Sequence, residues 1–204
     1  MRRMRSAEQR LEAALNELDA AQQLAAIVEA ERAGAEDYWR AVAGTPLRWA
    51  PRDSKRVPQH WLFTQPRESY RTGNRYGATD PFNALLNYGY TLLEAETRIA
   101  CLTAGLHPGL GLFHQDKDGR ASFVYDAMEP CRGISDRLAL EFIRGHTFHL
   151  GECWETREGF CRLDPDLAGR VVHWAAKFRP PAIAVVRDVV NYLSASATVM
   201  YRCN

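Results

Sequence analysis

The chain has 204 residues, of which 46% are hydrophobic and 25% are charged, and its formal net charge is +1. This composition is typical of a soluble globular protein with one core of roughly 150 to 200 residues. It argues against a membrane protein, because no uncharged apolar run approaches the roughly 18 residues that a membrane helix needs. The basic first residues lead into a polar amphipathic segment, which is unlike a signal peptide. We therefore expect a cytoplasmic protein without a membrane partner.

The first predicted element is a long helix over residues 6–42, which are rich in Ala, Leu, Glu and Gln. Its apolar residues recur at helical spacing and define the face that should be packed. They are Leu11, Leu15, Leu18, Leu24, Val28, Ala35, Tyr38 and Val42. Glu31 lies on this same face, where a carboxylate is costly to bury unless it is paired or coordinates a cation. The periodicity alone leaves both readings open: a contact with an Arg of another helix, or a cation site.

Residues 44–80 follow no lasting period and are predicted to form a long loop. The loop carries seven basic residues against three acidic ones. The basic residues are interleaved with Trp49, Trp61, Phe63, Tyr70 and Tyr76. This mixture suits nucleic acid, since cations neutralise phosphates and aromatic rings stack on unpaired bases. The alternative is a solvated crossover loop whose aromatic residues pin it to the core.

A second long helix is predicted over residues 81–104. Asp80 followed by Pro81 is typical of a helix start, because Pro lacks the N–H that would be unpaired there and Asp accepts bonds from the next free amides. One stripe of this helix is apolar and comprises Phe82, Leu85, Leu86, Leu92, Leu93, Ile99, Ala100 and Leu102. Another stripe consists of side chains that form hydrogen bonds, namely Asn83, Asn87, Tyr90 and Glu94. We expect the apolar stripe to pack against that of the helix over 6–42.

A glycine-rich turn follows this helix, and beyond it His114 stands between apolar residues and an acidic turn. The next helix is predicted to open with acidic residues, Asp126 and Glu129, which face the same way at i, i+3. One imidazole and these two carboxylates are of the right types to converge on an ion.

The remaining elements are a helix over 136–144, a hairpin over 153–163 that turns at Glu158-Gly159, and a helix over 165–177. The dipeptide Pro180-Pro181 is predicted to break the chain before a last amphipathic helix over 182–193 and a weakly patterned tail.

The five cysteines are odd in number and include no C-x-x-C pair, which indicates reduced thiols. His146, His149, Cys153 and Cys161 have the residue types of a zinc site. Their spacing matches no common zinc motif, however, and both cysteines fall on the predicted hairpin. A structural zinc site is therefore disfavoured here.

Three blocks of sequence, in their order and spacing, resemble the signature of the CRISPR-associated adaptation integrases, the Cas-one family. The blocks are NALLNYGYTLLEAE from Asn83, AGLHPGLGLFH ending at His114, and SFVYDAMEPCR ending at Arg132. The segment ERAGAEDYW from Glu31 is similar to the family's upstream block. The resemblance covers roughly residues 26–193.

This resemblance implies a mainly α fold: a helical catalytic domain over 26–193 that includes the basic loop over 44–80 and one or two short β-hairpins. Residues 1–25 are then a helical extension continuous with the domain, and residues 194–204 are a C-terminal tail. Family members normally begin with a separate β-rich domain, which we expect to be absent from this chain.

By the same resemblance, Glu31, His114 and Asp126 hold a divalent ion, and Glu129 is a further ligand or base. Two carboxylates and one imidazole suit Mg²⁺ or Mn²⁺ better than a thiolate-loving metal. The implied enzyme is a metal-dependent DNA integrase and endonuclease that joins the 3′-hydroxyl of a spacer DNA to the CRISPR repeat by transesterification. The residues predicted to contact DNA are Arg67, Arg71, Arg75, Asn87, Tyr90 and Arg132.

The implied partners are double-stranded and branched DNA, including the CRISPR repeat, a second copy of the chain in a homodimer, and the small Cas-two type protein of the adaptation complex. An alternative from another class is a truncated or degenerate relative that binds DNA or a partner protein without catalysis. Metal-dependent cleavage of branched DNA discriminates between the two.

Overall fold

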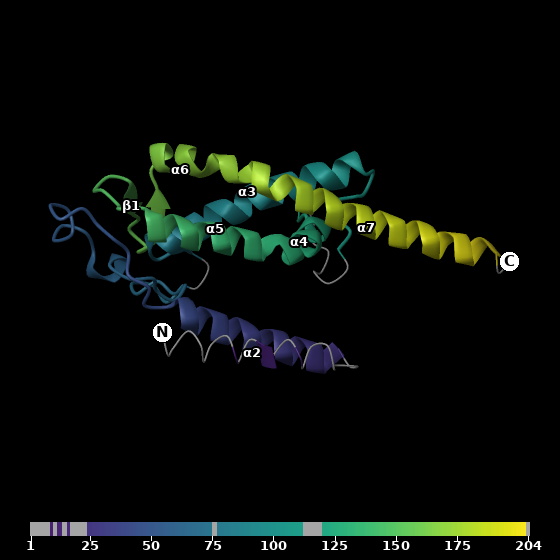
Figure 1. The fold of residues 1–204 in the computed structure, drawn as a ribbon, viewed down its shortest axis with the longest axis horizontal. Coiled ribbons are helices and arrows are strands. Elements are labelled where there is room, and N and C mark those ends of the chain that lie inside the picture. The colour runs from purple at the N-terminus through teal and green to yellow at the C-terminus, as the bar shows by residue number, and fades with distance from the viewer. Residues whose placement is uncertain are drawn as a thin grey trace.

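A computed structural model describes residues 9, 12, 13, 16, 24–74, 77–111 and 120–202 of the chain (Figure 1). Its helices are α2 (Leu24–Val42), α3 (Pro81–Thr103), α4 (Ser122–Met128), α5 (Arg132–Gly145), α6 (Pro165–Val171) and α7 (Ala175–Arg202), with 3₁₀ turns η1 (Gln59–Trp61), η2 (Glu129–Cys131) and η3 (Val172–Trp174). Strands β1 (Cys153–Glu155) and β2 (Cys161–Leu163) pair antiparallel. The predicted mainly α fold with a short β-hairpin is confirmed.

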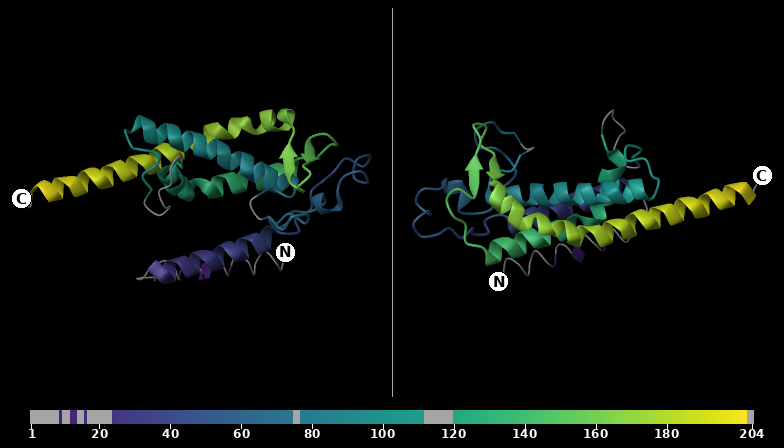
Figure 2. Two further views of the ribbon diagram at one scale, coloured as in Figure 1. Left: turned by 180° about the vertical axis from the view of Figure 1, so that it is seen from behind. Right: turned by 90° about the horizontal axis from the view of Figure 1, so that it is seen from above.

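The helical body is built around α3, which packs against α4, α5, α7 and β2. Figures 1 and 2 show α3, α5 and the first half of α7 side by side. The buried residues on these helices include Phe82, Leu85, Leu86 and Leu93 of α3, Ala139 and Ile143 of α5, and Phe178, Ala182 and Val186 of α7. They recur every three or four positions because one stripe of each helix faces the bundle.

Both ends of α3 lie where the sequence places them. At its start, the buried Asp80 carboxylate accepts the backbone N–H of Asn83 at 3.0 Å. At its end, Gly105 has a φ of 76°, which costs glycine little. This conformation lets the N–H groups of Gly105 and Leu106 bond the carbonyls of Leu102 and Cys101, at 3.1 and 2.9 Å. Paired bonds of this kind satisfy the last carbonyls of a helix and end it.

Helix α3 lies close to Ser135 of α5 at Gly89, where a Cβ atom would lie 2.2 Å from the Ser135 hydroxyl oxygen and 3.5 Å from the Trp174 ring. We expect Gly89→Val to lower the free energy of unfolding by about 2 kcal/mol, because the added methyl groups overpack this contact. Gly133 is the matched control, since it is exposed on α5 with nothing within 4 Å of its Cβ position. Urea denaturation of both variants measures the difference, and a Gly89→Val variant as stable as Gly133→Val would contradict the close contact.

The predicted break at Pro180-Pro181 is wrong, because both prolines lie inside α7. The missing N–H groups leave unpaired the carbonyls of Ala176 and Lys177, two exposed residues whose backbone water can reach. Burial of Phe178 and Ala182 against the bundle holds the helix on both sides of the prolines. The 3₁₀ turn η3 lies just before α7, and α7 continues into the predicted tail as far as Arg202. No helix in the described ranges has an apolar stretch long enough to cross a membrane.

The prediction that the helices over 6–42 and 81–104 pack against each other is wrong for the described part of the chain. Among the described side chains of α2, those that pack against the core are Tyr38, Trp39 and Val42, near its C-terminal end, while Ala35 is exposed. Figures 1 and 2 show the rest of α2 running beside the body and apart from α3. The apolar stripe of α3 packs against α5 and α7 instead.

Two further predictions about apolar and acidic positions are corrected. Ile99 and Leu102, which were assigned to the apolar stripe of α3, are 55% and 59% exposed. The helix expected to open with acidic residues begins earlier, at Ser122, so Asp126 lies near its end and Glu129 lies in η2. The earlier start has a packing cause, since Phe123 and Val124 are buried and both N–H groups contact the Pro108 carbonyl.

Candidate functional site

The acidic residues of α4 and η2 continue into a polar stripe that runs along one side of three consecutive elements. Asp126, Glu129, Arg132 and Asp136 follow one another at i, i+3, i+6 and i+10, a spacing that places them on one helical face. Asp126 is half-buried, whereas the Glu129 carboxylate is exposed and lies 3.1 Å from the Arg132 guanidinium. The stripe therefore combines three carboxylates with one arginine.

The structure describes part of the predicted metal site. Asp126 is described, whereas for Glu31 the structure gives its place in α2 but not its side chain, and His114 lies outside the described residues. Within the described ranges, no three His, Cys, Asp or Glu side chains lie close enough together to hold a metal ion. The convergence of Glu31, His114 and Asp126 thus stays a prediction. The chemistry of Asp126 and its neighbour Glu129 fits it, because carboxylate oxygens are the donors that Mg²⁺ and Mn²⁺ prefer.

A second set of polar side chains meets where α2, α3 and α5 come together. We call Tyr38, Tyr90, Arg132 and Asp136 the Asp136 cluster. The Tyr90 hydroxyl donates to the Asp136 carboxylate at 2.5 Å, and the Arg132 guanidinium lies over the Tyr90 ring, 5.3 Å from its centre. Burial raises the pKa of Asp136, while the Tyr90 hydroxyl and the nearby arginines act to lower it.

Both tyrosines of this cluster remain protonated donors. Burial, and then the charge of Asp136, raises the pKa of Tyr38 and of Tyr90. The Tyr38 hydroxyl is buried and, within the described residues, has no hydrogen-bond partner, so the Asp136 carboxylate is the acceptor that it faces. Three helices therefore converge on one carboxylate.

The predicted DNA contacts lie partly around this cluster. Arg67 donates to the Asn87 side chain on α3, and its charge reaches Asp136. The Nε groups of Arg67 and Arg132 are buried without a partner among the described residues. Asn87 and Tyr90 thus lie on neighbouring turns of α3, as its polar stripe predicts, and Arg132 of α5 lies over the Tyr90 ring.

The rest of the basic loop is held to the hairpin and the core. Arg71 pairs with Glu155 of β1 at 2.6 Å, and His60 lies 2.9 Å from the same carboxylate. The indole of Trp49 donates to the Trp61 carbonyl, and that of Trp61 donates to the Thr79 carbonyl, each at 3.0 Å. The tryptophans therefore pin the loop, as the crossover-loop alternative expects. Arg75 and Tyr76 lie outside the described residues.

The four residues with the types of a zinc site, His146, His149, Cys153 and Cys161, have separate partners or are free. His146 lies 2.9 Å from Glu152, and His149 lies 3.8 Å from Asp53. Cys153 and Cys161 are buried and free. Burial, and then the contact with Cys153, raises the pKa of Cys161, which keeps it a thiol and not a thiolate ligand.

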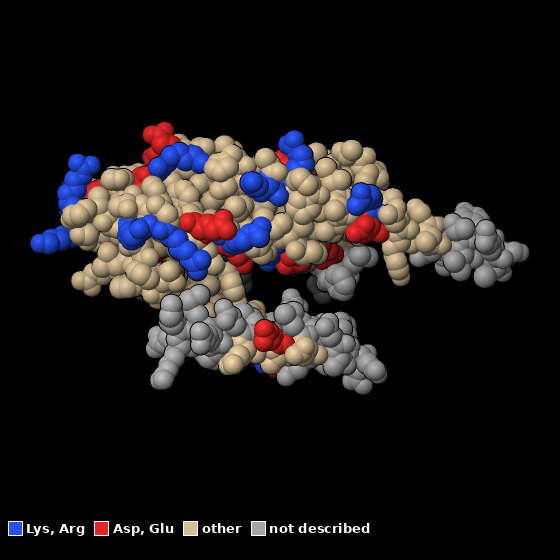
Figure 3. All heavy atoms as spheres, viewed as in Figure 1, with Lys and Arg blue, Asp and Glu red and all other residues tan. Residues whose placement is uncertain are grey.

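Charges of both signs are interspersed over the face of the molecule in Figure 3. No broad basic patch is seen on the described residues of this face. Attraction of DNA to it therefore depends on local contacts rather than on a field of one sign.

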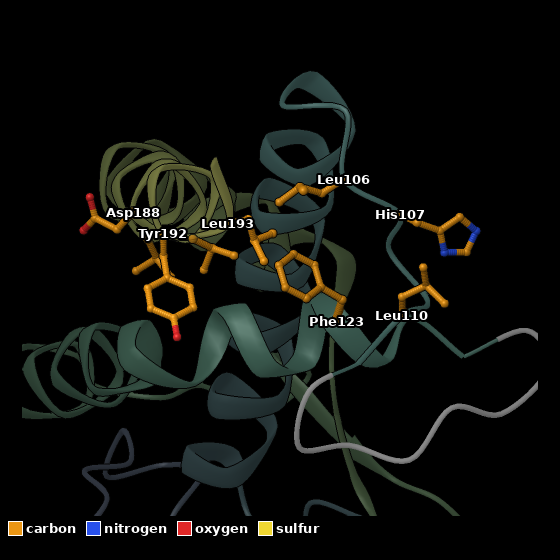
Figure 4. Close-up of a pocket in the computed structure, with 9 residues that line it drawn as sticks. Leu106, His107, Leu110, Phe123, Asp188, Tyr192 and Leu193 are labelled. Atoms are coloured by element: carbon orange, nitrogen blue, oxygen red, sulfur yellow. The ribbon is translucent and has the colours of Figure 1, made fainter. Parts of the chain in front are cut away.

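A largely apolar groove of 490 Å³ lies between α4, the turn after α3 and the outer half of α7. In Figure 4 the side chains of Leu106, Phe123 and Leu193 line it, whereas the His107 imidazole points away. None of the predicted site residues that the structure describes lines this groove.

Sequence reasoning missed Tyr38 and Asp136 as members of a polar site. Tyr38 was assigned to an apolar stripe, and Asp136 to the start of an ordinary helix. A signal was present, because Asp136 continues the spacing of Asp126, Glu129 and Arg132. Finding the cluster needed the extra knowledge that the helix runs on from η2 into α5.

Comparison with known proteins identifies relatives along most of the chain. Residues 2–175 match the family model described as CRISPR associated protein Cas1. The CRISPR-associated endonuclease Cas1 of Korarchaeum cryptofilum is 32% identical over 174 residues, which cover 82% of this chain and 47% of that protein. One from Archaeoglobus fulgidus is 33% identical over 77% of this chain and 44% of its own length. The chain spans less than half the length of these relatives.

Solved structures show the same fold. A structure described as a casposase bound to integration product aligns with a TM-score of 0.70 and 25% identity, over 90% of this chain and 54% of that one. A chain of a Cas6-RT-Cas1–Cas2 complex aligns with a TM-score of 0.70 and 18% identity, over 96% of this chain and 21% of its own. The second likeness is one of fold alone.

Proposed function

The chain belongs to the Cas1 family of CRISPR-associated proteins, and on that basis we propose that it is a metal-dependent DNA integrase and endonuclease of CRISPR adaptation. The observation that carries the proposal is the family match over residues 2–175, which includes all of the predicted ligands. The stripe of Asp126, Glu129, Arg132 and Asp136 supports this proposal, since it presents the carboxylates of Asp126 and Glu129 on one side of the helical body.

In the proposed reaction, the 3′-hydroxyl oxygen of a spacer DNA forms a bond to a phosphorus of the CRISPR repeat, and the bond from that phosphorus to the leaving 3′-oxygen breaks. Mg²⁺ or Mn²⁺, held by Glu31, His114 and Asp126, supplies charge stabilisation to the phosphate when it is bound. Glu129 accepts the proton of the attacking hydroxyl, and the leaving oxygen takes a proton from solvent. Cleavage uses water as the nucleophile at the same site.

We propose that DNA reaches this site along the polar stripe of α3 and the basic loop. Asn87 and Tyr90 supply polar groups there, and Arg67 and Arg132 supply positively charged guanidinium groups beside them. That a casposase with this fold has been seen bound to its integration product is consistent with a DNA substrate.

The proposed partners are a second copy of the chain and a small protein of the Cas2 type. Relatives of the same fold occur in Cas1–Cas2 complexes, which supports an assembly of this kind. The DNA partners are double-stranded and branched DNA, with the CRISPR repeat as the integration target.

Strand transfer with purified protein tests the proposed function. A labelled spacer DNA with a free 3′-hydroxyl is incubated with repeat DNA in Mn²⁺, in Mg²⁺ or in a chelator. We expect a joined product only with metal, and none from a spacer whose 3′ end lacks the hydroxyl. DNA binding without joining or cleavage in any metal would instead favour a relative that binds DNA without catalysis.

Replacement of Arg67, Arg71 and Arg75 by alanine is expected to weaken DNA binding and to reduce its dependence on salt, by about one unit of log–log slope for each lost phosphate contact. Arg67 should account for more of the change than Arg71, because Asn87 leaves the charge of Arg67 intact whereas Glu155 neutralises Arg71. Binding titrations at several salt concentrations give the slope. Lys177→Ala, which removes an exposed cation from α7, serves as the control. A slope equal to that of the control would show that these loop arginines contact no phosphate.

A further inference from the structure

The described contacts of α2 with the helical body lie near its C-terminal end. Trp39 and Val42 supply apolar contacts there, and Tyr38 packs beside them with its buried hydroxyl facing the Asp136 carboxylate. Apolar packing is non-directional, so it leaves the rotation of α2 about its own axis weakly defined. A polar contact with fixed donor and acceptor directions defines that rotation.

The position of Tyr38 on α2 relates this contact to the predicted catalytic glutamate. Glu31 and Tyr38 are separated by seven residues, about two helical turns, and therefore lie on the same face of the helix. Whatever fixes Tyr38 also fixes the direction in which the backbone of α2 presents residue 31.

Asp136 also belongs to the stripe that contains Asp126, Glu129 and Arg132. Asp136 lies one turn after Arg132 on α5, and Arg132 pairs with Glu129, three residues after Asp126. Tyr90 locks this side to α3 through its 2.5 Å bond to Asp136. The carboxylate thus faces α2 on one side and belongs, on the other, to the continuous segment that carries Asp126.

We propose that Asp136 is a positioning residue: by binding Tyr90 and facing Tyr38, it fixes α2 against α3 and α5 and so sets where Glu31 stands relative to Asp126. The consequence for catalysis rests on the proposed function. Since a displacement of about 1 Å in a catalytic group costs up to about 100-fold in rate, loss of the contact between Tyr38 and Asp136 lowers kcat.

The placement of α2 is measured directly, without any assay of activity. Spin labels are attached to cysteines introduced at Ala33 on α2 and Glu141 on α5, both of which are exposed, in a chain with Cys203→Ser. The other four cysteines are buried. Pulsed electron resonance gives the distance distribution between the labels. We expect Asp136→Ala and Tyr38→Phe to shift or broaden it.

Tyr192→Phe is the matched control, because it also removes one tyrosine hydroxyl, but from an exposed position on α7 that has no part in the proposed site. It should leave the distance distribution and kcat unchanged. Asp136→Ala and Tyr38→Phe should each lower kcat about 10- to 100-fold. Tyr38→Phe should do so with KM nearly constant, because it leaves the bond between Tyr90 and Asp136 in place. Combined, they should be no worse than Asp136→Ala alone, because both remove the same contact.

Several outcomes decide the inference. An unchanged distance distribution in both variants overturns it, and so does an additive loss of activity in the double variant. If Asp136→Ala fails to fold, Tyr38→Phe alone decides, since it deletes a single oxygen. If the parent chain proves inactive but the distances shift as expected, the positioning of α2 by Asp136 stands and the proposed function fails.

Discussion

Replacing Glu31, His114 or Asp126 by alanine is expected to abolish strand transfer nearly as completely as replacing all three together. The reason is that ligands of one ion act as a unit, so that the first loss removes the site and later losses have little left to remove. Each single variant should fall by at least about 10³-fold in rate. The joined DNA product, measured in Mn²⁺, gives the rates.

Glu36→Ala is the matched control for the glutamate. It also removes a carboxylate from α2, but from an exposed position beside Arg32, and it should retain full activity. Circular dichroism should show unchanged helix content in all of these variants. Activity in Glu31→Ala close to that of Glu36→Ala would show that Glu31 is not a ligand, and a triple variant far worse than each single one would show that the three do not serve one ion.

The largest expected loss of stability follows replacement of Asp80 by alanine. The Asp80 carboxylate is fully buried and accepts three bonds: from the Asn83 backbone N–H at 3.0 Å, from the Asn83 side-chain amide at 2.5 Å, and from the Gln65 N–H at 2.9 Å. Burial raises the pKa of Asp80, while these donors act to lower it. Without the carboxylate, three buried donors lose their acceptor, which should cost about 3 to 5 kcal/mol.

Asp164 provides the comparison for this prediction, because it caps α6 through one bond, from the Asp166 N–H at 3.0 Å, in a less buried place. Asp164→Ala should cost about 1 kcal/mol. Thermal and urea unfolding measure both variants. If the two losses were equal, burial and the tie to Gln65 would add nothing to an ordinary helix cap.

Residues that cap helices and form turns made much of the fold predictable from the sequence. Asp80-Pro81 and Gly105 mark the two ends of α3 through capping chemistry that needs no distant partner. Glu158-Gly159 likewise marks the hairpin turn, where Gly159 has a φ of 80°. The boundaries that these residues set are correct because their physical causes lie within a few residues of each boundary.

The failures have tertiary causes. Pro180-Pro181 would end an isolated helix, but burial of Phe178 and Ala182 against the bundle outweighs the lost backbone bonds. The apolar stripes of the first two long helices are matched in sequence, yet α3 buries its stripe against α5 and α7. A periodicity shows that a helix has a face to bury and does not show which partner covers it.

In the candidate site, too, local features were predicted and contacts between distant segments were not. Asp126 and Glu129 were predicted from their spacing to face the same way, and they lie on consecutive elements, α4 and η2, with the Glu129 carboxylate paired to Arg132. The meeting of Tyr38 and Asp136 depends on contact between helices that are about 100 residues apart in the chain. No local pattern encodes such a contact.

The described contacts of α2 with the helical body lie near its C-terminal end, so a rotation about Tyr38 displaces the residues that precede it. Its 19 residues form a rod about 28 Å long. A turn of about 5° about Tyr38 would move residue 31 by about 1 Å and Leu24 by about 2 Å. The first displacement already exceeds the tolerance of about 0.5 Å for a catalytic constellation. A DNA strand or partner protein that pushes on α2 near Leu24 therefore exerts about twice the torque about Tyr38 that the same force would exert at residue 31.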